Sequence, residues 1–248
     1  MKAFNVGRDD IVLDFFSGSA STGEAVARLN LASASHVHWI LVQLPENLEN
    51  NLRTAKGSSK KVTKNAIAYL KKKGKEPVLT ELAEERLRIT GSELAKEVAE
   101  LNVQQKREEE ARKLPDIGFR IFKLDDTGIE QPNDGQFLID RIKPDRSDLD
   151  IIFEVMLKWG YELTYPIEKA EFAGYECYSV AAGDLICCME PGLTVDALEA
   201  IAAEEPLPRR VFIMDSVFAG DDSLKLNALA IFKRVEEQTQ QKIELRTV

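Results

Sequence analysis

The feature that most constrains the fold is a strand–loop–helix–strand pattern near the start of the chain. Residues 11–16 are a short apolar run that ends in a loop of small residues, and residues 37–44 are a second apolar run. Residues 21–29 between them have helical character, and Ser21 and Glu24 have the spacing of a capping box. Two buried strands joined by a helix predict a βαβ unit and a parallel sheet.

The rest of the chain also alternates between helical and strand patterns, so the predicted fold class is α/β. Residues 80–110 favour one or two amphipathic helices, which follow a helical piece at residues 64–73. Pro115 marks the boundary between two regions, 1–115 and 116–248. In the second region we expect strands at 119–124, 175–181, 185–189, 210–214 and 242–246, and helices at 148–159, 194–203 and 223–235.

Composition excludes several classes of protein. The chain is 44% hydrophobic, which allows a sizeable core, but it has no apolar run long enough to span a membrane and no apolar signal segment at its start. Its three cysteines, of which Cys187 and Cys188 are adjacent, do not form a disulfide framework, and we expect them to be buried small hydrophobes. His36 and His38 lie far from the cysteines in the sequence and do not form a metal-ligand pattern with them. These features predict a cytoplasmic protein without a metal site.

Charge is distributed unevenly along the chain. Residues 1–115 have a net charge of +3, whereas residues 116–248 have a net charge of −12. Nine basic residues lie between Arg53 and Lys75 with no acidic residue among them. This stretch is either a solvated insertion, within about 51–110, or an arm that contacts phosphates. The lysines that would contact nucleic acid are Lys60, Lys61, Lys64, Lys71, Lys72 and Lys73.

The densest local signal is the loop of residues 14–23, which joins the first strand to its helix. Ligands of open α/β sheets bind beyond the carboxyl ends of the strands, and small residues let the backbone approach a ligand closely. The following helix directs its free N–H groups and its positive dipole end at the same place. The alternative is a tight strand-to-helix turn that binds nothing.

Several segments resemble one protein family. Residues 11–19, Ile-Val-Leu-Asp-Phe-Phe-Ser-Gly-Ser, resemble the S-adenosylmethionine-binding motif of amino-type DNA methyltransferases. Residues 39–46 resemble the second strand of the modification subunits of type III restriction-modification systems. Further segments are similar to later parts of those subunits, in the same order: residues 82–88, 118–125 and 210–218 with Asn227. The resemblance implies a partial Rossmann-like methyltransferase sheet in residues 1–115, followed by a smaller α/β domain.

The resemblance also implies which residues would bind the cofactor. Phe16, Gly18 and Ser19 would lie against the methionine part of S-adenosylmethionine, and Gln43 or Glu46 would accept hydrogen bonds from its ribose. One position departs from the motif, because alanine replaces its second glycine, and this methyl group either crowds the ligand or is harmless, depending on φ. The complete set of implied cofactor residues is Asp14, Phe16, Gly18, Ser19, Ala20, Thr22, Gly23, Gln43 and Glu46.

The catalytic motif of these enzymes, Asp/Asn-Pro-Pro followed by an aromatic residue, does not occur, since no two prolines are adjacent. We therefore expect a fragment of an adenine-N6 DNA methyltransferase that has no catalytic residue and is inactive alone. The family acts on DNA and joins a restriction subunit with helicase and nuclease activity. The expected partners are a second copy of the chain or a chain with the missing motif. The alternative is a non-catalytic module that docks the restriction subunit or a second methyltransferase chain.

Overall fold

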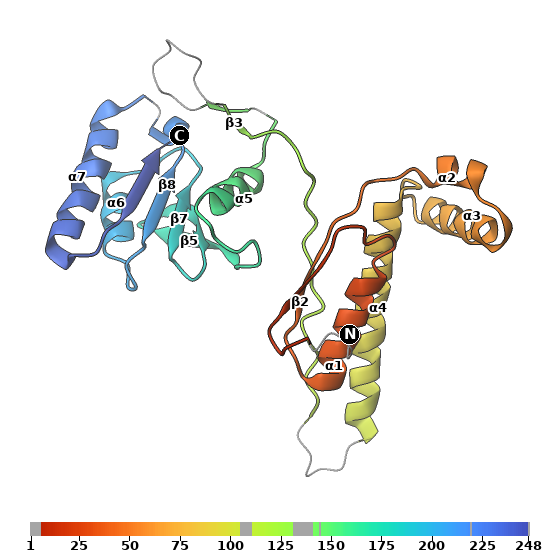
Figure 1. Ribbon diagram of the computed structural model, residues 1–248. Helices are drawn as coiled ribbons and strands as arrows, with labels where there is room; N and C mark the ends of the chain where they lie inside the picture. The colour runs from red at the N-terminus through yellow and green to blue at the C-terminus, as the bar shows by residue number, and fades with distance from the viewer. Residues whose placement is uncertain (1–5, 105–110, 131–140, 144, 219, 248) are drawn as a thin grey trace. The chain divides into compact units, whose positions relative to one another are not determined.

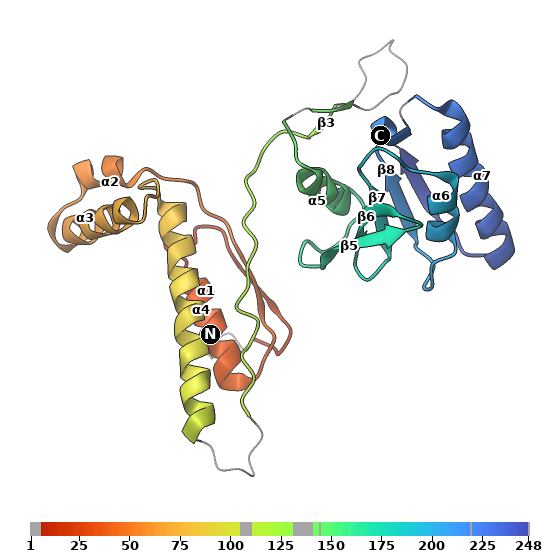
Figure 2. The same ribbon diagram turned by 180° about the vertical axis from the view of Figure 1, so that it is seen from behind.

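The chain consists of two units, residues 1–119 (unit 1) and residues 120–248 (unit 2). The computed structural model describes residues 6–104, 111–130, 141–143, 145–218 and 220–247 (Figures 1 and 2). Unit 1 extends beyond the expected boundary because Ile117 lies beside Gly91 and the ring of Phe119 lies 6.1 Å from that of Trp39. Among the described residues, no helix has both the length and the apolar character needed to cross a membrane.

Unit 1 contains the predicted βαβ arrangement. Strand β1 (Ile11–Asp14) pairs in parallel with β2 (His38–Leu41), and helix α1 (Ser21–Ser33) connects them. Helix α4 (Leu79–Gln104) packs along α1, as Figures 1 and 2 both show. The helices that follow β2 are α2 (Leu48–Thr54), α3 (Gly57–Lys72) and α4 (Leu79–Gln104).

One face of the β1–β2 pair is covered by α1 and α4. Gly23 allows this packing, because a Cβ atom at its position would lie 2.9 Å from a methyl group of Leu87 and 3.0 Å from one of Leu41. Trp39, on the same face as Leu41, is half-buried and contacts the ring of Phe119. Helices from well-separated parts of the chain therefore build a single layer on this side of the strands.

The opposite face of the β1–β2 pair is open among the described residues. Ile11, Leu13 and Ile40 are 65%, 47% and 51% exposed. The expectation of two fully buried strands is therefore wrong for this face. Parallel strands usually need cover on both faces, and α1 and α4 supply it on only one.

Unit 2 contains a five-stranded mixed sheet. Its strands are β5 (Ile167–Phe172), β6 (Tyr175–Val180), β7 (Leu185–Cys188), β8 (Arg210–Ile213) and β9 (Glu244–Thr247), which lie in the order β5-β6-β7-β8-β9. Strands β5 to β7 are antiparallel, whereas β7, β8 and β9 are parallel. The helices are α5 (Asp148–Lys158), α6 (Val195–Ala202), α7 (Asp222–Thr239) and the short 3-10 helix η2 (Asp215–Phe218). A separate two-stranded ribbon joins β3 (Ile129–Glu130) to β4 (Arg141–Ile142).

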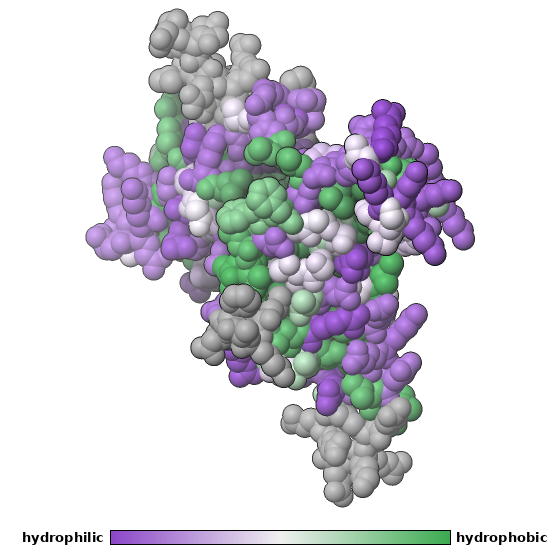
Figure 3. Space-filling model, turned by 45° about the vertical axis from the view of Figure 1, so that its right-hand side comes forward, coloured by the Kyte–Doolittle hydropathy of each residue, from purple (hydrophilic) through white to green (hydrophobic). Residues whose placement is uncertain are grey.

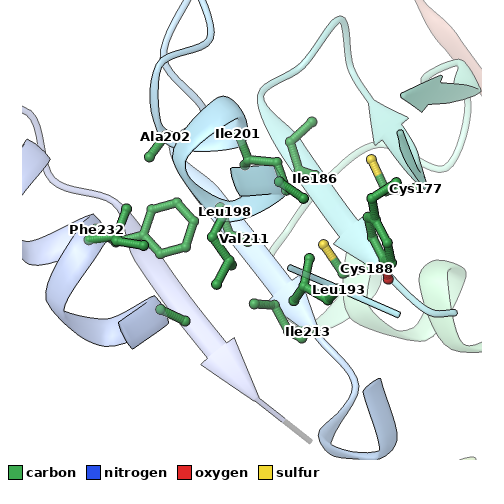
Figure 4. Packing of buried hydrophobic residues seen from close by; sticks show 14 of the residues in the cluster. Cys177, Ile186, Cys188, Leu193, Leu198, Ile201, Ala202, Val211, Ile213 and Phe232 are labelled. Atoms are coloured by element: carbon green, nitrogen blue, oxygen red, sulfur yellow. The ribbon is translucent and has the colours of Figure 1, made fainter. Parts of the chain in front are cut away.

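Both faces of this sheet are covered, and successive residues of β7 belong to opposite cores. Ile186 and Cys188 pack with α6 and α7 (Figure 4), while Leu185 and Cys187 pack with α5 on the other side. All four side chains are fully buried. A continuous apolar run is what a central strand with two covered faces requires.

Several predictions for unit 2 are confirmed, and one is wrong. The helices predicted at 148–159 and 194–203 correspond to α5 and α6, and the predicted hairpin corresponds to β6 and β7. No strand forms at residues 119–124. Ile121 and Phe122 are both 49% exposed, and this segment pairs with no described strand. Strand β5 was not predicted, because its charged side chains mask its apolar face.

Candidate functional site

The loop of residues 15–20 lies at the carboxyl ends of both strands of unit 1. The amide of Val42 donates to the carbonyl of Asp14 (2.8 Å), and the amide of Ser17 donates to the carbonyl of Val42 (3.2 Å). These bonds extend the β1–β2 pairing into the loop. Gly18 then adopts a φ of +55°, and a Cβ atom built there meets nothing within 4 Å. The loop therefore exposes a left-handed glycine next to open space, a conformation that strains other residues.

The Asp14 side chain connects the loop to the start of α1 through hydrogen bonds. One carboxylate oxygen accepts from the backbone N–H of Phe16 (3.2 Å), and the other accepts from the Thr22 hydroxyl (2.5 Å). The carboxylate joins the strand end to the first turn of the helix. An acidic residue here organises the site through the backbone whether or not it also touches a ligand.

The start of α1 differs from the predicted capping box. The N-cap is Ala20, with a φ of +62°, and among the described residues no side chain caps this helix end. Glu24 instead binds two arginines, Arg28 and Arg86. Hydrogen bonds from Arg86 and Arg28 lower the pKa of Glu24. The prediction failed because α4, which supplies Arg86, competes for the carboxylate that a capping box would use.

The end of the second strand contributes Gln43 and Glu46. The side-chain oxygen of Gln43 accepts from the amide of Gly18 (2.7 Å), which ties the two strand ends together. The carboxylate of Glu46 accepts from the amide groups of Gln43 (3.5 Å) and Asn51 (3.1 Å), and it remains exposed. The Gly18–Gln43 bond could not be predicted, because loop geometry decides which donor the glutamine reaches.

The structure brings most of the predicted cofactor residues to one place but gives them different roles. Phe16 is 88% exposed, and Ser19 is partly buried next to Gly18. Ala20 is completely buried, so its methyl group does not project into the open space beside Gly18. Gly23 lies on the covered side, where it contacts Leu41 and Leu87, so its role is packing.

The residues at this loop fit S-adenosylmethionine in part. The first-turn N–H groups of α1, which no side chain caps, suit the carboxylate of the methionine moiety. The exposed ring of Phe16 offers an apolar surface, and the exposed carboxylate of Glu46 can accept hydrogen bonds from a ribose diol. Asp14 and Gln43 are already engaged within the chain, so they shape the site more than they offer ligand contacts.

The predicted nucleic-acid lysines lie on and just after α3. Ile67 and Leu70 on this helix are buried against Leu48 of α2. Hydrophilic side chains dominate the surface at the α2–α3 end of unit 1 (Figure 3). Two of the six predicted lysines have acidic partners: Lys71 binds Glu49 at 2.6 Å, and Lys73 lies 3.9 Å from Glu85. All six are exposed: Lys60, Lys61, Lys64, Lys71, Lys72 and Lys73.

Glu85 of α4 is the centre of a buried ion-pair network in unit 1. It is 6% exposed and accepts from the Tyr69 hydroxyl (3.1 Å), while Lys75 (3.2 Å) and Arg88 (3.1 Å) surround it. Burial opposes ionisation, but the hydrogen bonds from Lys75 and Tyr69 outweigh it and lower the pKa of Glu85. This network joins α3, the turn after it and α4.

Unit 2 contains a cavity that the sequence did not predict, with a volume of about 380 Å³. Its lining includes Tyr175 and Lys169. The Tyr175 hydroxyl donates to the carbonyl of Glu190, and Lys169 pairs with Glu176. These polar groups therefore already have partners within the chain.

The three cysteines are buried, as predicted. Burial raises the pKa of Cys177 to about 12 and raises the pKa values of Cys187 and Cys188 as well. The protonated thiols behave as small apolar side chains.

Comparison with models of known protein families found no match for this chain, and comparison with curated proteins found none. The geometry of the loop therefore carries the functional argument.

Proposed function

We propose that this chain is the cofactor-binding part of an adenine-N6 DNA methyltransferase of the type III restriction-modification class, within a partial Rossmann-like sheet. The observation that carries the proposal is the loop at Gly18. It follows a parallel strand, precedes an uncapped helix and faces open space at the carboxyl ends of β1 and β2. This is where α/β sheets bind nucleotide-like ligands. The resemblance of residues 11–19 to the S-adenosylmethionine motif specifies which ligand.

The chain alone is proposed to transfer no methyl group. S-adenosylmethionine would supply an activated methyl group, but the target amine must also be held, and this sequence has no Asp/Asn-Pro-Pro-aromatic segment to hold it. The role of Asp14 is to position the loop through Phe16 and Thr22. The missing motif would come from another polypeptide segment.

The open face of the β1–β2 pair supports such a partner. Ile11, Leu13 and Ile40 form an apolar surface, and two strands alone rarely make a stable sheet. A protein segment that carries the catalytic motif and adds strands here would cover this face. A second copy of the chain is the other proposed occupant, and the restriction subunit is the expected further partner.

A calorimetric titration with S-adenosylmethionine tests cofactor binding. We expect saturable binding by the unmodified chain and loss of binding in Asp14→Ala, because this substitution releases both Phe16 and Thr22. Asp9→Ala is the matched control, since Asp9 is exposed and has the same charge. Circular dichroism must show that both variants remain folded. A folded, unmodified chain that binds no cofactor would refute the proposal.

Transfer of tritium from labelled cofactor to DNA tests the proposal that the chain alone transfers no methyl group. The purified chain should transfer none, and addition of a chain with the missing motif should restore transfer. Transfer by the chain alone would contradict the proposed inactivity.

One observation favours a second candidate, a non-catalytic interaction module. The Gly18 amide, the Asp14 carboxylate and the Gln43 side chain all find partners within the chain, so the loop closes without a ligand. In that case the titration is flat, and the open face of β1–β2 still mediates association.

A further inference from the structure

Helix α3 has a buried apolar side and, beginning next to it, an exposed arc of lysines. Ile67 and Leu70 face the rest of unit 1 and are buried. Lys60, Lys64 and Lys71 follow one another at four and seven residues, so they form one row that borders the buried side at Ile67. Lys61 and Lys72, three turns apart, lie beside this row. We call these five exposed residues the lysine face: Lys60, Lys61, Lys64, Lys71 and Lys72.

The lysine face is charged in a way that disfavours the helix. Lys60 and Lys64 are like charges one turn apart, which destabilises a helix. The first turn contains no acidic residue, so positive charge accumulates at the positive end of the helix dipole. Of the lysine face, only Lys71 has an acidic partner among the described residues. A bound polyanion would offset this repulsion.

Helix α4 shows what an ordinary solvated helix of this protein looks like. Its Arg88 pairs with Glu84 and Glu85 within the helix, and its Glu93 pairs with Arg28 of α1. Opposite charges alternate there and neutralise one another. Because α3 lacks this pattern, the lysine face is not explained by solubility alone.

We propose that the lysine face binds the phosphate backbone of duplex DNA. The choice of DNA rests on the proposed function, since a DNA methyltransferase must hold its substrate. Lys60 and Lys71 are about 16 Å apart along the helix axis. One strand of B-form DNA presents about five phosphates over that length.

The side chains favour a duplex over a single strand. Single-stranded nucleic acids bind on exposed aromatic rings that stack with bases. The one aromatic residue of α3, Tyr69, is half-buried and donates its hydroxyl to Glu85. Lysines also act as point charges without base-specific geometry, so the contact reads no sequence.

Fluorescence anisotropy with a labelled duplex of about 30 base pairs tests the proposal at about 50 mM salt and above. The variant is Lys60→Gln, Lys64→Gln and Lys72→Gln combined, which keeps good helix formers and removes three charges that have no acidic partner in the part of the chain that the structure describes. The matched control is Lys96→Gln, Lys113→Gln and Lys233→Gln, exposed residues elsewhere that change the net charge equally.

We expect the α3 variant to lose about tenfold or more in affinity, and its plot of log affinity against log salt to flatten by about 2 to 3. The control should stay within about twofold, and two unrelated duplex sequences should behave alike. Equal losses in both variants, absence of duplex binding by the unmodified chain, or a preference for single strands would overturn the proposal. Titration with S-adenosylmethionine separates the two proposals, because α3 substitutions should leave it unchanged.

Discussion

At the scale of single residues, the backbone of the 15–20 loop decides what the site can be. Gly18 and Ala20 both have positive φ values, but Gly18 borders open space whereas Ala20 is buried. The sequence left open whether the Ala20 methyl group would crowd a ligand. The structure answers this, because the methyl group lies away from the space beside Gly18. Positive φ without a glycine costs free energy, so the surrounding contacts must hold Ala20 in place.

Gly18→Ala should destabilise unit 1 by about 1 kcal/mol. The added methyl group meets no atom within 4 Å, so the cost comes from the left-handed backbone alone. Gly18→Asn should cost less, because asparagine tolerates this conformation better. Urea unfolding measures both values. Equal stability of the glycine and alanine forms would show that the loop does not hold φ at +55°.

The resemblance to the S-adenosylmethionine motif implied that Asp14, Gly18 and Gln43 belong to one site, and the βαβ pattern predicted that the two strand ends lie together. It did not reveal that Gly23 packs against Leu87. That contact depends on which later helix covers the strands, and local sequence does not encode it.

At the scale of secondary-structure elements, Glu85 connects α3 and α4. Its carboxylate is stabilised in the folded state by Lys75, Tyr69 and Arg88, so its pKa lies below the ordinary value of 4.5. A lowered folded-state pKa gives stability that is present above pH 4.5 and is lost as the pH falls through the folded-state pKa.

Glu85→Gln should therefore lower the free energy of unfolding by about 1 to 3 kcal/mol at neutral pH. The difference from the unmodified protein should shrink as the pH falls below 4.5, because protonation then removes the same charge. Urea unfolding at several pH values measures this difference, which cancels the titration of the other carboxylates. A difference that stays constant down to low pH would exclude a structural role for the ionised group.

Helices with clear apolar spacing and capping residues were predicted well. Ser147 forms the capping box of α5, and Thr194 caps α6. The strand expected at 119–124 fails, since an apolar run becomes a strand only where a neighbouring strand pairs with it. The one or two helices predicted at 80–110 correspond to the single helix α4 up to Gln104, and residues 105–110 lie outside the described part.

At the scale of the whole molecule, the two units differ in how completely they bury their apolar surface. Unit 2 covers both faces of its sheet, with α6 and α7 on one side and α5 on the other. Unit 1 leaves the face with Ile11, Leu13 and Ile40 exposed. The alternation of helical and strand patterns predicted an α/β chain in two regions, but it did not give the exposure of each strand, because exposure depends on the number of strands that assemble.

Residues 120–248 produced alone should fold cooperatively, because both cores of unit 2 lie within this range. Its thermal midpoint should lie within about 5 °C of the corresponding transition in the full chain. The buried thiols provide the check, since Cys177, Cys187 and Cys188 should react with a thiol reagent only after denaturation. Rapid reaction under native conditions would show that this unit needs unit 1 to fold.

The two adjacent cysteines of β7 can report the order in which the helical layers of unit 2 open during unfolding. Cys187 lies in the layer beneath α5, and Cys188 lies in the layer beneath α6 and α7. Two probes one residue apart thus report on opposite sides of the same strand. If α5 detaches before the other helices, Cys187 becomes labelled first, and pulsed labelling of the two single-cysteine forms would reveal the order in which the layers open.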